Sequence, residues 1–273
     1  MDRVKIGRCE VSRFILGSNP FSGFSHQRPE RDQEMVHYWS CARIKEALRQ
    51  AEALGINTVI ARADHHMLRV LTEHWDEGGR LHWFAQTCPE LGAPEPTLRR
   101  VAGVNAPACH IHGGYADHLL AKGALAKLIP TVQYARSLGL VVGLAAHETA
   151  TLRWAEEHLD VDYYMCSYYN PIPRKDSAEH QHGYDEAYLE EDRRAMTDLI
   201  QELTKPVIHY KILAAGRNDP AGAFEVAARA MRPGDAVCVG VYTKDHPGML
   251  ADDVAMFERA LASRAAGAGR RVT

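Results

Sequence analysis

The sequence predicts an α/β fold, a (β/α)8 or TIM barrel in which eight parallel strands alternate with helices. Short apolar runs alternate with segments of helical periodicity along the chain, and no linker interrupts the alternation. The expected strands are apolar on both faces, which is typical of parallel strands that lie between a barrel interior and a layer of helices. The length of 273 residues suits one such barrel.

A doubly wound sheet is the alternative arrangement. When such a sheet binds a dinucleotide, its first strand is followed by glycines in the spacing GxGxxG. The segment GSNPFSG at 17–23 does not have this spacing, so the barrel is favoured. We assign residues 1–264 to a single barrel domain and expect 265–273 to form a frayed C-terminal tail.

The expected elements follow one another in order. The strands are Phe14–Gly17, Thr58–Ala61, His82–Gln86, Ala108–His112, Val141–Ala145, Asp162–Ser167, Val207–Tyr210 and Ala236–Val239. The helices are Ala42–Leu54, Met67–Glu77, Leu125–Leu138, Thr149–His158, Tyr184–Leu203, Ala221–Met231 and Met249–Ala262, with Leu98–Ala102 as a weaker candidate.

Composition excludes several classes of protein. Hydrophobic residues make up 46% of the chain and charged residues 25%, which allows a large core. The net charge of −3 is spread along the chain, so we expect no nucleic-acid partner. We find neither an apolar run long enough to span a bilayer nor an apolar signal segment, and we therefore expect no membrane partner. The partner that we expect is a small-molecule substrate. The six cysteines include no CxxC pair, which favours free thiols in the reducing cytoplasm; the oligomeric state stays open.

Histidines follow four of the predicted strands, at the end where a barrel carries its active site. They are His65, His112, His147 and His209. Imidazoles from neighbouring strands are a common divalent-metal site, so these four are the candidate metal ligands. His110 and His112 share one strand face, although His110 can equally pack in the barrel and bond a carbonyl group.

Other ionisable groups at the same ends are candidates for acid/base catalysis. Glu148 and Asp64 are candidate bases, and His65 and His112 candidate acid/base imidazoles. Lys211 is a candidate for stabilising oxyanion charge. For three of them a structural role is equally open: Asp64 as a helix N-cap, Glu148 as a first-turn helix charge, and Lys211 in an ion pair. The long loop 170–188, with His180 and His182, is either a lid or a solvated loop.

The order of the segments resembles the aldo-keto reductase superfamily over almost the whole chain. VKIGRCEVSRFILG at 4–17 resembles that family's opening hairpin, which closes the barrel bottom, and its first strand. LGINTVIA, IHGG, VGLAAH, YYNP and VIHYKILAAG resemble its second, fourth, fifth, sixth and seventh strands. The resemblance implies NADP or NAD as cofactor, His112 as the active-site histidine and Tyr210 as the ring that stacks on nicotinamide. It also implies Asn170 and Lys244 as cofactor-binding residues.

The family's catalytic Asp, Tyr and Lys are not matched. Their positions fall near Ile60, His65 and Gln86, and Met249 stands near an expected arginine. We therefore favour a rebuilt active site with a divalent transition metal that assists acid/base chemistry of the isomerase, epimerase, lyase or hydrolase type, on a hydroxylated or carbonyl substrate. A divergent NAD(P)-dependent reductase is the second hypothesis, and a non-catalytic binding barrel the third.

The seventh strand separates the first two hypotheses. Side chains alternate along a strand, so Tyr210 is not expected to share a face with His209 and Lys211. An inward Tyr210 favours the reductase, whereas inward basic residues favour the metal or oxyanion role. A bulge at the strand end can relax this rule.

Overall fold

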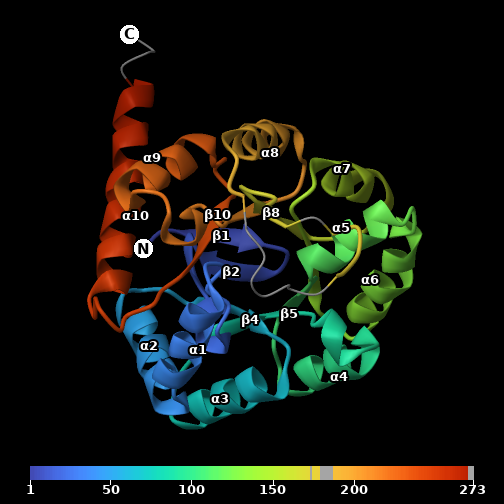
Figure 1. Cartoon of the computed structure of the whole chain (residues 1–273), viewed down its shortest axis with the longest axis horizontal. Helices are drawn as coiled ribbons and strands as arrows, with labels where there is room; N and C mark the ends of the chain where they lie inside the picture. The colour runs from blue at the N-terminus through green and yellow to red at the C-terminus, as the bar shows by residue number, and fades with distance from the viewer. Residues whose placement is uncertain (173, 179–186, 270–273) are drawn as a thin grey trace.

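The structure is a computed structural model, and it describes residues 1–172, 174–178 and 187–269 (Figure 1). Within these residues the parallel strands close into a barrel in the order β10-β3-β4-β5-β6-β7-β8-β9. The strands are β3 Phe14–Gly17, β4 Thr58–Arg62, β5 His82–Gln86, β6 Ala108–Ile111, β7 Val141–Ala146, β8 Tyr163–Ser167, β9 Val207–Tyr210 and β10 Ala236–Gly240. The predicted barrel is therefore confirmed, with strand limits that agree to within one residue.

Helices surround the barrel on all sides (Figure 1). They are α1 Pro29–Tyr38, α2 Cys41–Ala53, α3 His65–Asp76, α4 Pro94–Gly103, α5 Gly113–Ala121, α6 Leu128–Ser137, α7 Thr149–His158, α8 Glu190–Glu202, α9 Pro220–Ala230 and α10 Met249–Gly269. Short 3-10 turns lie at Asn19–Ser22, Pro89–Leu91, Leu125–Lys127 and Ala214–Gly216. None of the helices among the described residues is long and apolar enough to cross a membrane.

Two of these helices were not predicted, and α4 and α10 are longer than expected. α1 is largely polar, and α5 begins with Gly113-Gly114, a pair that is more typical of a loop. α10 continues to Gly269, so the first part of the expected tail 265–273 is helical, which its alanine-rich sequence favours. Residues 270–273 lie outside the described part.

An antiparallel hairpin of β1 Arg3–Ile6 and β2 Cys9–Ser12 closes one end of the barrel. Its apolar side chains, including Ile6 and Val11, pack in one cluster with the inward-facing side chains of the barrel, such as Phe84 and Tyr163. The turn needs a glycine, because Gly7 has a φ of +56° and an added Cβ would lie 2.7 Å from Val141 Cγ1. The carboxyl ends of the strands remain as the open face.

The barrel interior is filled by aromatic and small residues in combination. Tyr163 is fully buried, and its ring occupies the space that a side chain on Gly143 would need, since an added Cβ there would lie 2.4 Å from the ring. Its hydroxyl donates a hydrogen bond to the carbonyl of Cys109 at 3.1 Å. The interior is packed toward the end that the hairpin closes, and polar side chains lie at the carboxyl ends of the strands. The functional groups are therefore expected at that open end, the mouth of the barrel.

Candidate active site

Two adjoining pockets open at the carboxyl ends of the strands. The first, the apolar pocket, has a volume of about 490 Å³, and its wall includes Ile60, Met165, Cys238, Tyr242 and Met249. The second, the polar pocket, has a volume of about 300 Å³, and its wall includes Arg62, His112, His147, Arg174 and Lys211. The two pockets share lining residues: Asn19, Phe24, His26, Arg62, Gln86, Tyr210 and Lys211.

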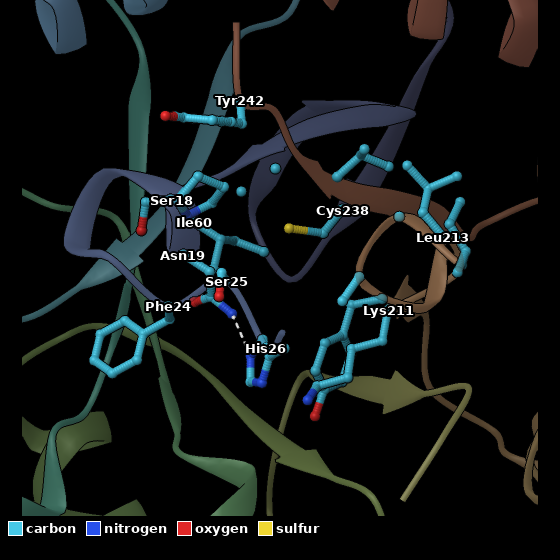
Figure 2. A pocket seen from close by; sticks show the side chains of 18 of the residues that line it. Ser18, Asn19, Phe24, Ser25, His26, Ile60, Lys211, Leu213, Cys238 and Tyr242 are labelled. Atoms are coloured by element: carbon cyan, nitrogen blue, oxygen red, sulfur yellow. Dashed lines mark hydrogen bonds between the residues drawn. The ribbon is translucent and has the colours of Figure 1, made fainter. Parts of the chain in front are cut away.

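The apolar pocket is elongated. Figure 2 shows Tyr242 at one end and Lys211 and His26 at the opposite end, with Cys238 between them. Burial raises the pKa of the Cys238 thiol to about 12, so this sulfur stays protonated at neutral pH and is not a nucleophile.

Tyr210 and Lys211 both line the two pockets, although they are neighbours in the chain. β9 ends at Tyr210, and Lys211 has a φ of +58°, which is in the left-handed region. This backbone reversal ends the alternation of the strand and brings the lysine to the same side as the tyrosine. The predicted conflict at this strand is therefore resolved by one residue in an unusual conformation.

His209 lies on the other face of β9 and is fully buried. Its Nε2 donates to Asp235 Oδ2 at 3.3 Å, and its Nδ1 accepts from the Tyr168 hydroxyl at 3.0 Å. Both ring nitrogens are thus used outside the mouth, and the structure corrects the assignment of His209 as a metal ligand.

A hydrogen-bonded chain of three side chains leads from a buried carboxylate to the mouth of the barrel. Asp117 of α5 is 1% exposed, and its Oδ2 accepts a hydrogen bond from His147 Nδ1 at 2.8 Å. With its Nδ1 proton directed at the carboxylate, His147 presents Nε2 as an acceptor to the Tyr210 hydroxyl, 3.3 Å away. The arrangement Asp117–His147–Tyr210 holds the tyrosine oxygen at the border between the two pockets.

The same carboxylate organises the start of α7. Asp117 also accepts from the His147 and Glu148 backbone N–H groups, at 2.9 and 3.3 Å, and from the Thr151 hydroxyl at 2.8 Å. Burial raises its pKa to about 6, and these hydrogen bonds oppose that rise. Burial also raises the pKa of Tyr210 well above its usual value, which disfavours a free tyrosinate.

His112 lies at the N-cap position of α5 and lines the polar pocket. Burial, followed by the nearby charge of Arg174, lowers its pKa well below the usual value, so the imidazole is neutral. Its Nδ1 is buried and has no hydrogen-bond partner among the described residues. A neutral imidazole with free hydrogen-bonding capacity can contact a polar ligand group directly.

Gly113 and Gly114 allow the close packing around this histidine. A Cβ on Gly113 would lie 3.1 Å from the Tyr210 oxygen and 3.2 Å from His147 Cε1. A Cβ on Gly114 would lie 2.9 Å from both Arg174 Cζ and His112 Cε1. The two glycines therefore explain both why α5 was not predicted and how its first turn can pack so closely at the mouth.

His110 lies on β6, deeper than His112, which follows the strand as the N-cap residue of α5, and it is fully buried. Its Nε2 donates to Gln86 Oε1 at 3.4 Å, and its Nδ1 lies 3.3 Å from the Tyr163 hydroxyl. Burial lowers its pKa to about 3, so it stays neutral in the core.

Two further candidates of the second strand end face away from the pockets. His65 is exposed at the first position of α3, so the structure corrects its assignment as catalytic residue and metal ligand. Asp64 is the N-cap of that helix, where its Oδ1 accepts from Met67 N at 2.8 Å, and it forms an ion pair with Arg62 at 3.1 Å. The structural alternative for Asp64 is therefore correct.

Three other candidates lie outside both pockets. Asn170 Nδ2 donates to Glu148 Oε1 at 2.6 Å, and neither side chain lines the pockets, so this geometry does not support Glu148 as a base or Asn170 as a cofactor-binding residue. Lys244 forms an ion pair with Glu34 on the surface and lines neither pocket, so its role as a cofactor-binding residue stays a prediction. His180 and His182 of the proposed lid lie outside the described residues.

The predicted metal centre is not supported by this geometry. His112 and His147 both line the polar pocket, but His65 and His209 lie elsewhere. In the part of the chain that the structure describes, no group of at least three His, Cys, Asp or Glu side chains is arranged to hold a metal ion. Sequence reasoning also missed Asp117, Arg174 and Asp253; for Asp117 the available signal was an acidic residue within the apolar stretch GGYADHLLA.

Comparisons with known proteins find similarity in three-dimensional structure but not in sequence. No protein-family model and no curated protein matches the sequence. A structure from Pseudomonas aeruginosa described as an aldo-keto reductase has a TM-score of 0.65 at 18% identity and covers 96% of this chain and 95% of its own. An aldo-keto reductase from Bacillus halodurans in its holo form has a TM-score of 0.56 at 9% identity, with coverages of 95% and 96%. The fold is that of the aldo-keto reductases.

This barrel also resembles other enzymes. The truncated 3-deoxy-D-arabino-heptulosonate 7-phosphate synthase of Thermotoga maritima has a TM-score of 0.57 at 12% identity and covers 98% of this chain and 92% of its own. At such identities the likeness is one of fold, so the chemistry has to be inferred from the side chains at the mouth.

Proposed function

We propose that this protein is a nicotinamide-dependent oxidoreductase that interconverts a carbonyl group and a hydroxyl group on a small substrate. The observation that carries the proposal is the position of Tyr210. Its side chain borders both pockets, and its hydroxyl is hydrogen-bonded to a buried His147–Asp117 pair. A cofactor in the apolar pocket and a substrate in the polar pocket would therefore meet at this oxygen.

The apolar pocket has features that fit a dinucleotide. Its wall offers apolar and aromatic surface at Met165, Tyr210 and Ile60, and such surface suits a planar ring. The chain that leaves β9 also borders the pocket, and it holds Ala214 and Ala215 at φ values of +48° and +53°. Left-handed alanines are strained, and strained backbone is concentrated at ligand sites.

A reduced nicotinamide would supply a hydride at this place. The proton follows a separate route through the protein's own side chains. In the direction of oxidation, the substrate hydroxyl gives its proton to the Tyr210 oxygen while Tyr210 gives its own to His147 Nε2, and Asp117 stabilises the resulting imidazolium. Reduction reverses both transfers. Because burial raises the pKa of Tyr210, this coupled transfer is favoured over a free tyrosinate.

The lining of the polar pocket favours an acidic substrate. Arg62, Arg174 and Lys211 line it, and Glu90 is the carboxylate among its described lining residues. Arg174 is held in place because its carbonyl accepts a hydrogen bond from His118 Nδ1 of α5 at 2.7 Å. A carboxylate or phosphate group on the substrate matches this lining, and a volume of about 300 Å³ suits a small compound.

The test combines binding with turnover. NADH and NADPH are titrated against the protein by fluorescence, and small keto acids and aldehydes are then screened for cofactor oxidation. We expect Tyr210→Phe to bind the dinucleotide within about threefold of the wild type and to lose about 10²–10⁴ in turnover, since it lacks the proton carrier.

Tyr134→Phe is the matched control, because that hydroxyl accepts a hydrogen bond from Arg99 on the surface of the barrel. It should leave both binding and turnover unchanged. The proposal fails if neither dinucleotide binds at millimolar concentration, or if Tyr210→Phe retains full turnover.

A further inference from the structure

A buried carboxyl group at the far end of the apolar pocket has no hydrogen-bond partner among the described residues. Asp253 of α10 lines this pocket and is 4% exposed. Within the described residues it makes neither a hydrogen bond nor an ion pair, whereas most buried polar groups in proteins are hydrogen-bonded. A carboxyl group that is nearly buried, lines a cavity and has no hydrogen-bond partner among the described residues can accept a hydrogen bond from a ligand there.

Its position in the pocket follows from the helix. Met249 Sδ accepts a hydrogen bond from the Tyr242 backbone N–H at 3.4 Å, and Asp253 lies four residues further along α10, on the same face. Tyr242 marks the end of the pocket opposite Lys211 (Figure 2). Asp253 is therefore at the end remote from Tyr210 and Lys211.

Negative charge dominates around this end. Arg31 stacks on the Tyr242 ring at 4.4 Å, but its guanidinium is paired with Glu34 at 2.7 Å and lies 3.8 Å from Asp245. Lys244 is also paired with Glu34. With Asp252 and Asp253, the nearby carboxylates outnumber these two cations, so an additional phosphate would meet like charge.

We propose that Asp253 selects the cofactor: it accepts a hydrogen bond from the adenosine half of an unphosphorylated dinucleotide, so that the protein prefers NAD(H) to NADP(H). This inference rests on the proposed function. A carboxylate that accepts a hydrogen bond from a ribose hydroxyl is a general means of selecting NAD, just as an arginine accommodates the additional phosphate of NADP. Here Asp253 is at the remote end, where Arg31 also lines the pocket but is paired with Glu34, whereas Arg62, Arg174 and Lys211 line the substrate end.

The test measures dissociation constants for NADH and NADPH by isothermal titration calorimetry, which needs no substrate. Wild-type protein should bind NADH at least about tenfold more tightly than NADPH. Asp253→Asn should bind NADPH about tenfold more tightly than the wild type does, because the charge is removed, and NADH a few-fold more weakly. Asp198→Asn is the matched control: its carboxyl is exposed on α8 and lines neither pocket, so both affinities should stay unchanged.

The outcomes separate the two proposals. If both dinucleotides bind and NADPH binds as tightly as NADH or more tightly, or if Asp253→Asn leaves the ratio unchanged, the role of Asp253 is refuted and the oxidoreductase proposal stands. If neither binds, both are refuted. A thermal melt checks folding, and we expect Asp253→Asn to melt no lower than the wild type, because it removes a buried carboxyl group without a partner.

Discussion

Replacing Asp253 with asparagine removes a carboxyl group that the fold keeps nearly dry, and this has a consequence for stability that does not depend on any ligand. Burial raises the pKa of Asp253 from 3.8 to about 7 in the folded protein. The folded state therefore holds this proton more tightly than the unfolded state does, and the wild type loses stability as the pH rises from about 4 to about 7. Asparagine does not titrate, so the variant escapes this loss.

The size of the effect follows from the pKa values. A rise from 3.8 to about 7 covers about three pH units at about 1.4 kcal/mol each, and because the pocket admits water we expect about 2–4 kcal/mol. Urea unfolding is followed by tryptophan fluorescence at pH 4 and pH 8 for the wild type, Asp253→Asn and the exposed control Asp198→Asn. The free energy of unfolding of Asp253→Asn, relative to the wild type, should increase by that amount between the two pH values. A difference that is independent of pH, or one shared by the control, would refute the reasoning.

Other substitutions test the hydrogen-bonded chain and the packing around it. Asp117→Asn places an NH₂ group against the donors of either His147 or Thr151, which donate to different carboxylate oxygens, and should lower the free energy of unfolding by about 2–4 kcal/mol in urea titrations at neutral pH. Gly113→Ala should leave the melting temperature within a few degrees of the wild type but reduce turnover at least about tenfold, because a 1 Å misplacement at a catalytic group is costly and the new Cβ meets the Tyr210 oxygen. Gly103→Ala is its control in α4, where an added Cβ meets nothing within 4 Å, and it should be neutral or slightly stabilising in the same assays. Lys244→Ala should leave NADH affinity unchanged in calorimetry, because this side chain is paired with Glu34 on the surface and does not line the apolar pocket.

The barrel could be predicted because its signals are local and repeated. Each strand is a short apolar run, and parallel strands buried on both faces leave this pattern whatever the site contains. Three strands, among them β9 at Val207–Tyr210, have the predicted limits. α5 was missed because its first turn contains Gly113-Gly114. These glycines are required by the close packing against His147 and Arg174, although their helix propensity is low.

The site was harder to predict because its geometry depends on side-chain direction. Sequence reasoning placed His112, His147, Tyr210 and Lys211 at the mouth, but the joint inward direction of the last two depends on one left-handed residue that no local pattern indicates. His65 was placed at the correct end of its strand, but it points to solvent from the first turn of α3.

Functional residues that lie on helices are the hardest to predict from the sequence. Asp117 and Asp253 lie on α5 and α10 rather than at a strand end, and the carboxyl group of each is buried. Their importance comes from what surrounds them: His147 and Thr151 donate to Asp117, whereas Asp253 lines a pocket without a described partner. Only tertiary contacts distinguish the two cases.

The β1–β2 hairpin has a kinetic consequence. With one end of the barrel sealed by Ile6, Val11 and their neighbours, any ligand enters and leaves through the same opening. The two pockets share the side chains of Tyr210 and Lys211, so an occupant of one forms part of the wall of the other. Because both ligands use one opening, they should bind and dissociate one after the other. Steady-state kinetics with two ligands should therefore show a compulsory order of binding rather than independent binding.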